Sequence, residues 1–90
     1  MGQFKIKVYG TDWCGDCIRV KRFFHKYQIP YEWINIDENK EAEKLVIEIN
    51  HGNRSVPTIF LHDGSILVEP SDAELKEKIY NIQEGVKNER

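Results

Sequence analysis

Two cysteines separated by two residues, Cys14 and Cys17, have the type and spacing to do chemistry. A thiol becomes a strong nucleophile only as a thiolate, and a helix N-terminus favours that anion because its unpaired N–H groups and dipole point toward the sulfur. From Cys14 to about Gln28 an apolar stripe recurs at helical spacing and is expected to face inward: Cys17, Val20, Phe24 and Tyr27. Cys14 is therefore expected to begin a helix, and Cys17 to lie one turn further on. We therefore predict that Cys14 attacks a disulfide and that Cys17 resolves the resulting mixed disulfide.

A Cys-x-x-Cys pair can also be half of a zinc site. Such a site needs two further ligands, and His25, His51 and His62 have spacings unlike those of a zinc finger or zinc ribbon. We expect no metal, because a Cys-x-x-Cys pair beside a β-α-β pattern is typical of a redox motif.

Length and composition limit the classes of protein that fit. The 90 residues, at 10.6 kDa, suit one domain spanning 1–90, with 83–90 expected to be a frayed polar tail. A net charge of −2 argues against a nucleic-acid binder, and no apolar run approaches the ~20 residues of a membrane helix. The first residues show neither a secretory signal nor a myristoylation motif. Residues 1–30 carry a net charge of +4, so the cysteine pair lies in a positive third of the chain.

The periodicity of apolar residues predicts an α/β domain with the order β-α-β-α-β-β-α. The first two strands are expected to be parallel across a crossover helix, and the last two to form an antiparallel hairpin about Asp63-Gly64. The pattern Ser71-Asp72-Ala73-Glu74 predicts a capping box for the last helix. The expected strands cover about 4–8, 31–36, 58–61 and 66–68, and the expected helices cover 14–28, from 37 or 39 to 49, and from 71 onward. The first strand is expected to have one buried face, with Phe4, Ile6 and Val8 pointing inward, and its pattern ends at Gly10.

Three motifs together resemble the glutaredoxin branch of the thioredoxin-like superfamily over nearly the whole chain. They are Trp13-Cys14-Gly15-Asp16-Cys17, Ser55-Val56-Pro57-Thr58 and Asp63-Gly64-Ser65. Within that branch, 50–58 and 69–71 are most similar to mycoredoxins and related glutaredoxin-like proteins. The resemblance implies a thioredoxin-like fold with a four-stranded mixed sheet and three helices. It also implies thiol–disulfide oxidoreductase activity at Cys14 and Cys17.

The resemblance further implies that Pro57 follows a cis peptide bond and faces the cysteines. The N–H and C=O groups of Val56 would then pair with a substrate backbone in a strand-like manner. Ser71 and Asp72 match the part of the family that binds the amino end of glutathione, although Ser71 also suits a helix cap.

Two side chains near these motifs are candidates for contact with substrate. Arg54 could bind the carboxylate of a small thiol, or it could be a solvated loop arginine. Trp13 could form one wall of a substrate groove, or it could shield the core.

Two departures from the family pattern bear on the chemistry. Gly-Asp stands between the cysteines where many glutaredoxins have Pro-Tyr, and the carboxylates of Asp16 and Asp12 are expected to oppose formation of the Cys14 thiolate. Glu69-Pro70 replaces a Gly-Gly pair before the last helix, and a carboxylate there would repel a carboxylate of glutathione. Glutathione, mycothiol, another small thiol and a protein disulfide all remain open as partners.

The sequence favours a cytoplasmic, monomeric enzyme that reduces protein disulfides or mixed disulfides between proteins and small thiols. Electrons would come from a small thiol or a flavoprotein reductase, with no bound cofactor and with neither nucleic acid nor membrane as a partner. One alternative is a dedicated hydrogen donor to a reductase such as ribonucleotide reductase. Relatives with that role have an aromatic-Gly-Arg-Pro stretch where this chain has Val68-Glu69-Pro70-Ser71. Another alternative is an iron–sulfur cluster or metal carrier.

Overall fold

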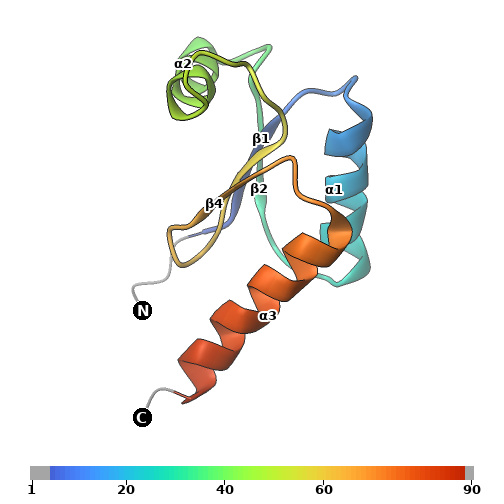
Figure 1. Ribbon diagram of the computed structural model, residues 1–90. Helices are drawn as coiled ribbons and strands as arrows, with labels where there is room; N and C mark the ends of the chain where they lie inside the picture. Colours follow the sequence, from blue (N-terminus) through green and yellow to red (C-terminus); the bar gives the residue numbers. More distant parts are fainter. Residues whose placement is uncertain (1–4, 89–90) are drawn as a thin grey trace.

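The computed structural model describes residues 5–88 and has the predicted order of elements (Figure 1). Phe4, expected to point inward from the first strand, lies outside the described residues. The strands are β1 (Lys7–Gly10), β2 (Glu32–Asn35), β3 (Thr58–Phe60) and β4 (Ile66–Val68), and the helices are α1 (Gly15–Lys26), α2 (Lys40–Ile49) and α3 (Asp72–Asn88).

The four strands form one mixed sheet in the order β2-β1-β3-β4. Val8 of β1 lies opposite Trp33 in the parallel pairing with β2 and opposite Ile59 in the antiparallel pairing with β3. The hairpin of β3 and β4 is antiparallel, as predicted. Because β1 is a central strand with both faces covered, Tyr9 is buried as well as Val8. The expectation of a single buried face on this strand is therefore wrong.

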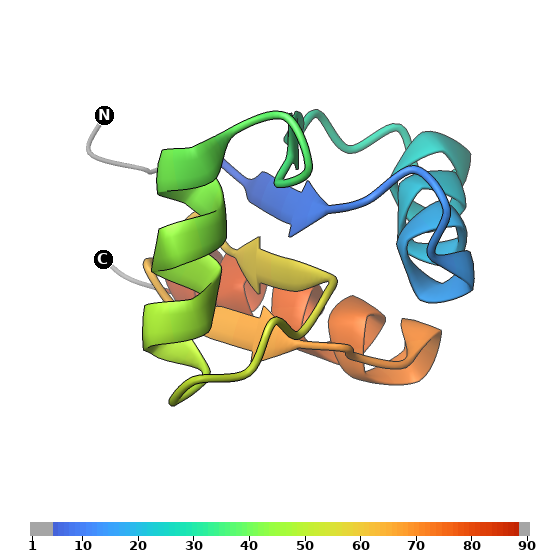
Figure 2. The same cartoon turned by 90° about the horizontal axis from the view of Figure 1, so that it is seen from above.

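Helices cover both faces of the sheet. Figures 1 and 2 show α2 on one side of the strands, whereas α1 and α3 lie on the other side. The smaller core, under α2, contains Tyr9, Ile36, Ala42 and Val46. The larger core joins β1 and β3 to α1 and α3 and contains Ile6, Val8, Val20, Phe23, Phe24, Ile59, Leu61, Leu75 and Ile79. This core fixes α1, and with it the cysteine pair, against the sheet.

The buried face of α1 differs at one position from the predicted stripe. Tyr27 was expected inside, yet its side chain is 41% exposed, and Phe23 is buried in its place. The reason is that the helix ends at Lys26, so Tyr27 is the C-cap and leaves the helical path before it can turn inward. Gln28 then adopts a φ of +55°, while the Ile29 N–H donates to the Phe24 carbonyl at 2.9 Å and closes the helix end.

Side-chain caps set the starts of the other two helices. The Asn39 side chain accepts a hydrogen bond from the Ala42 N–H at 2.9 Å and caps α2. The predicted capping box of α3 is confirmed, because the Glu74 N–H donates to Ser71 Oγ at 3.1 Å and the Ser71 N–H donates to Glu74 Oε1 at 2.8 Å. The helix then continues to Asn88, past Gln83 where the sequence suggested a frayed tail, since no proline interrupts it.

Candidate active site

Cys14 is the N-cap residue of α1, as its position in the motif predicts. Its backbone is extended, with φ −85° and ψ 124°, and its carbonyl accepts the first helical hydrogen bond, from the Ile18 N–H at 3.0 Å. The side chain is half-buried, and its thiol points at the Val56 carbonyl oxygen, 3.9 Å from the sulfur. The sulfur of Cys14 therefore lies at a positive helix end, beside the loop that precedes β3.

Cys17 occupies the opposite kind of environment, because its side chain is fully buried on α1. Burial raises the pKa of its thiol to about 12, and the neighbouring Cys14 thiol adds to the rise. The Thr11 N–H donates to its sulfur at 3.5 Å and acts in the opposite direction. Cys17 is thus a protonated, shielded thiol at neutral pH, whereas Cys14 is accessible.

Gly10, the last residue of β1, provides the space that the Cys17 sulfur fills. A Cβ at this position would lie 2.6 Å from Cys17 Sγ and 2.7 Å from Cη2 of Trp33. Sequence reasoning treated Gly10 only as the end of the strand pattern. A glycine in a strand also marks close approach of another group, and this signal could have identified it.

We predict that Gly10→Ala destabilises the reduced protein by about 1–3 kcal/mol, because the added methyl group must displace a buried sulfur and an indole ring. Denaturant titration of the reduced chain measures the effect. Gly15→Ala is the matched control, since nothing lies within 4 Å of a Cβ at that helical position. Equal stability of Gly10→Ala and the wild type would show that Cys17 and Trp33 can move to accommodate the methyl group without loss of stability.

The loop before β3 presents a cis peptide bond to the cysteines. The bond between Val56 and Pro57 is cis, as the family resemblance implies, and Pro57 is buried. Within residues 5–88 the Val56 N–H has no hydrogen-bond acceptor, so it is available beside the carbonyl that faces Cys14. The buried Thr58 holds the loop in place, because its hydroxyl accepts from Asn50 Nδ2 at 3.1 Å.

An ion-pair network occupies the rim of the site. The Trp13 ring is 69% exposed, and its Nε1 donates to Asp37 Oδ2 at 2.9 Å. The guanidinium of Arg54 pairs with Asp37 through Nη2 and with Glu43 through Nε, the latter at 2.6 Å. Arg54 first, and Trp13 second, hold the pKa of the Asp37 carboxyl below its usual range. Arg54 is therefore an exposed loop residue whose charge is already paired with two carboxylates.

Arg19, which sequence reasoning did not select, connects α1 to the start of α3. Its Nη1 donates to Asp72 Oδ1 at 2.7 Å, and its Nη2 donates to the Pro70 carbonyl at 2.9 Å. Ser71 between them caps α3 as described above, so Ser71 and Asp72 both have structural roles in the free protein. The contact joins residues 53 positions apart in the chain, and local sequence patterns contain no sign of it.

The two acidic residues expected to oppose the Cys14 thiolate both have polar partners. Asp16 lies 3.5 Å from Arg19 Nη2, an i,i+3 pair on α1 whose spacing could have been recognised. Asp12 accepts a hydrogen bond from Asn35 Nδ2 at 3.1 Å. Both carboxylates are exposed, and Arg19 partly offsets the negative charge nearest the cysteines.

Comparison with known proteins agrees with this geometry. The glutaredoxin family model matches residues 6–66, which include the cysteine pair, the cis-proline loop and the hairpin as far as the first residue of β4. The chain belongs to the glutaredoxin family.

This glutaredoxin-family chain has curated relatives of similar length. It is 40% identical over 77 residues to a Mycobacterium tuberculosis protein named as a candidate glutaredoxin, covering 86% of this chain and 92% of the relative. Mycoredoxin 1 of Corynebacterium glutamicum is 35% identical over 74 residues, covering 82% of this chain and 91% of mycoredoxin 1. Among solved structures, glutaredoxin from Archaeoglobus fulgidus superposes with a TM-score of 0.68 at 26% identity, covering 83% of this chain and 85% of that one.

The glutaredoxin-family chain brings Cys14, Cys17, Val56 and Pro57 together, as the motifs predicted. Trp13 and Arg54 share the carboxylate of Asp37 at the rim. In the part of the chain that the structure describes, no three His, Cys, Asp or Glu side chains are grouped to hold a metal ion.

None of the helices within the described residues is both long enough and apolar enough to cross a membrane.

Proposed function

We propose that this protein reduces protein disulfides and mixed disulfides between proteins and small thiols, with Cys14 as the nucleophile and Cys17 as the resolving thiol. The observation that supports this best is the contrast between the two sulfurs. Cys14 is accessible at the N-terminus of α1, whereas Cys17 is buried and protonated directly beneath it. A pair with these properties suits two consecutive exchange reactions with a defined order.

In the first step, the Cys14 thiolate attacks one sulfur of the substrate disulfide. A new disulfide joins Cys14 to that half of the substrate, and the other half leaves as a thiolate. In the second step, Cys17 attacks the sulfur of Cys14, and its proton goes to the departing substrate sulfur. The Cys14–Cys17 disulfide that results is reduced again by two electrons, supplied by two equivalents of a small thiol or by a dithiol reductase.

The neighbouring groups suit an extended substrate segment. The N–H and C=O groups of Val56 lie beside Cys14, where they can pair with a substrate backbone as a short strand would. The exposed ring of Trp13, the residue before Cys14 in the chain, provides an apolar surface for such a segment. Both contacts are independent of the substrate's sequence, so they suit proteins with different side chains around the disulfide.

The rim disfavours an anionic small thiol. Arg54, Asp37 and Glu43 together carry a net charge of −1, and the single cation is already paired. The exposed Glu69 lies next to the start of α3, where a second ligand carboxylate would have to approach. We therefore propose an uncharged low-molecular-weight thiol such as mycothiol, or a flavoprotein reductase, as the electron source in preference to glutathione. The protein would act as a monomer in the reducing environment of the cytoplasm.

A coupled turnover assay tests the proposal, with hydroxyethyl disulfide as the uncharged substrate and with mycothiol, glutathione and thioredoxin reductase offered in parallel. We expect turnover with mycothiol or the reductase and slower turnover with glutathione. Failure with all three, together with uptake of an iron–sulfur cluster on anaerobic reconstitution, would contradict the proposal and favour the carrier function.

Freeing Arg54 should improve the use of glutathione. We predict that Asp37→Asn together with Glu43→Gln lowers the KM for a glutathione mixed disulfide roughly two- to fivefold. The Arg54 guanidinium would then be free to form an exposed ion pair with a carboxylate of glutathione, and exposed ion pairs have energies that correspond to this range. The KM for hydroxyethyl disulfide should not change. Glu41→Gln together with Glu48→Gln is the matched control, because it removes two exposed carboxylates from α2 without touching Arg54. An equal decrease in KM for this control would assign the effect to net charge alone.

A further inference from the structure

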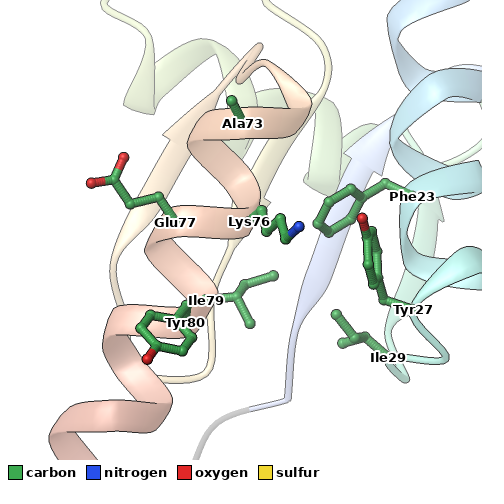
Figure 3. A pocket seen from close by; sticks show the side chains of 8 residues that line it. All are labelled: Phe23, Tyr27, Ile29, Ala73, Lys76, Glu77, Ile79 and Tyr80. Carbon is green, nitrogen blue, oxygen red and sulfur yellow. The ribbon is translucent and has the colours of Figure 1, made fainter.

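A groove of about 560 Å³ lies between the C-terminal end of α1 and α3 (Figure 3). The buried side chains of Phe23 and Ile79 form its floor. Tyr27 and Tyr80 form its sides and are 41% and 60% exposed, so both rings are accessible to a ligand. The catalytic scheme above uses none of these residues.

Unpaired cations border this apolar floor. The ammonium groups of Lys26 and Lys76 lie 5.3 Å and 5.5 Å from the centroid of the Tyr27 ring. Both lysines also line an adjoining hollow together with Arg22. Among the side chains of residues 5–82, no carboxylate lies within 4 Å of any of these three cations, whereas Arg19 and Arg54 each pair with two carboxylates. The positive charge at the groove is therefore available to a ligand.

The acidic residues near the groove do not neutralise it. Glu77 lines the groove, but Figure 3 shows its side chain on the opposite side of α3 from Lys76. Asp72, at the far end of the adjoining hollow, is bonded to Arg19. A two-fold pairing of two copies through this groove would place their lysines against each other, so like-charge repulsion disfavours a second copy as the occupant.

We propose that this groove docks an acidic peptide segment carrying one large apolar side chain, as part of a protein disulfide substrate. The apolar side chain would lie between Tyr27 and Tyr80, and the carboxylates would pair with Lys26, Lys76 and Arg22. The inference rests on the proposed function, and it adds a recognition surface for a particular class of substrate.

The distance from the nucleophile defines the substrate further. Tyr27 lies thirteen residues after Cys14 along α1, and at a helical rise of about 1.5 Å per residue the two are about 20 Å apart. An extended peptide spans that length with about six residues. The adjoining hollow, lined by Arg19, Arg22 and Phe23, leads along α1 between the two points. The acidic segment is therefore expected about six residues from the reactive cysteine of the substrate.

Matched synthetic peptides test the proposal with the full chain. One peptide carries a disulfide with an acidic segment and a Leu anchor six residues away, and a second has Gln and Asn in place of the acids. We expect a KM about fivefold lower for the acidic peptide. Lys26→Gln combined with Lys76→Gln should abolish that difference without changing kcat, and Tyr80→Ser should weaken both peptides. Lys44→Gln on α2 is the control, and hydroxyethyl disulfide turnover should stay constant throughout.

Binding measured without turnover separates this inference from the proposed function. Fluorescence anisotropy of labelled peptides with serine in place of cysteine should show the same preference for the acidic segment. Equal binding of the two peptides, or binding unaffected by the lysine substitutions, would overturn the docking site. Sedimentation showing a wild-type dimer that Tyr80→Ser dissociates would assign the groove to a second copy and overturn it too. Absent turnover of hydroxyethyl disulfide, with anisotropy intact, would contradict only the proposed function.

Discussion

Cys14→Ser is expected to reduce turnover to background for every disulfide substrate, whereas Cys17→Ser should remove only the reduction of protein disulfides. A serine hydroxyl at position 14 stays protonated near neutral pH and cannot begin the exchange. With Cys14 intact, a mixed disulfide with a small thiol can still be resolved by a second molecule of that thiol. A protein disulfide has no such resolving partner when Cys17 is absent. The two rates are measured side by side, with hydroxyethyl disulfide and a folded protein disulfide as substrates.

The Cys17→Ser variant should also accumulate a covalent complex with a protein substrate, visible by mass spectrometry as a disulfide at Cys14. Cys17 is buried, so a second variant, Cys17→Ala, guards against an effect of the hydroxyl group on folding. Both variants should keep the thermal transition of a folded domain. Full protein-disulfide reduction by either variant would show that Cys17 is not the resolving thiol, and residual turnover by Cys14→Ser would remove Cys14 from its role.

Local patterns were enough to predict most of the fold. Helical spacing and caps act over a few residues, so the start of α1 at Cys14 and the capping box at Ser71 could be inferred from neighbours alone. The hairpin followed in the same way from Asp63-Gly64, where Gly64 has a φ of +90°. The burial of Tyr9 could not be inferred, because it depends on β1 pairing with both β2 and β3, which are distant in the chain.

The residues of the site likewise fall into those that local patterns could predict and those that depend on long-range contacts. The cysteine pair and the cis-proline motif are each a short contiguous segment of the sequence, and both were recognised. The partners of Arg54 were not, because Asp37 and Glu43 lie 17 and 11 positions away and many other acids could have met it. Arg19 was overlooked for the same reason, since its bond to Asp72 exists only once α1 and α3 pack on one face of the sheet. Long-range pairing, more than residue type, decides which charges are free to bind a ligand.

In the folded Cys14→Ser protein, Cys17 is expected to react with iodoacetamide far more slowly than an ordinary cysteine. The reagent attacks only thiolate, and burial is the largest cause that raises the pKa of Cys17, to about 12 in the wild type, where the Cys14 thiol adds to the rise. Burial remains in the variant, so we expect the thiolate fraction at pH 7 to fall by roughly a hundredfold. The experiment uses Cys14→Ser, which leaves Cys17 as the only thiol, and follows the mass of the chain with time. The same chain in denaturant is the control and should react at the ordinary rate.

The pH dependence of that alkylation tests whether the pKa of Cys17 is raised. Because burial favours the protonated form, alkylation of Cys17 in the native Cys14→Ser chain should rise about tenfold per pH unit from pH 7 to beyond pH 9, where an ordinary thiol has already reached its full rate. The stability of the reduced wild type should be unaffected by Cys17 below pH 9 and should fall between pH 9 and pH 12. In that window the unfolded chain has released a proton that the folded chain still holds. Cys17→Ser should lose this part of the decline. Rapid alkylation of native Cys17 at pH 7 would show that its sulfur is open to solvent, and the division between an attacking Cys14 and a shielded Cys17 would not stand.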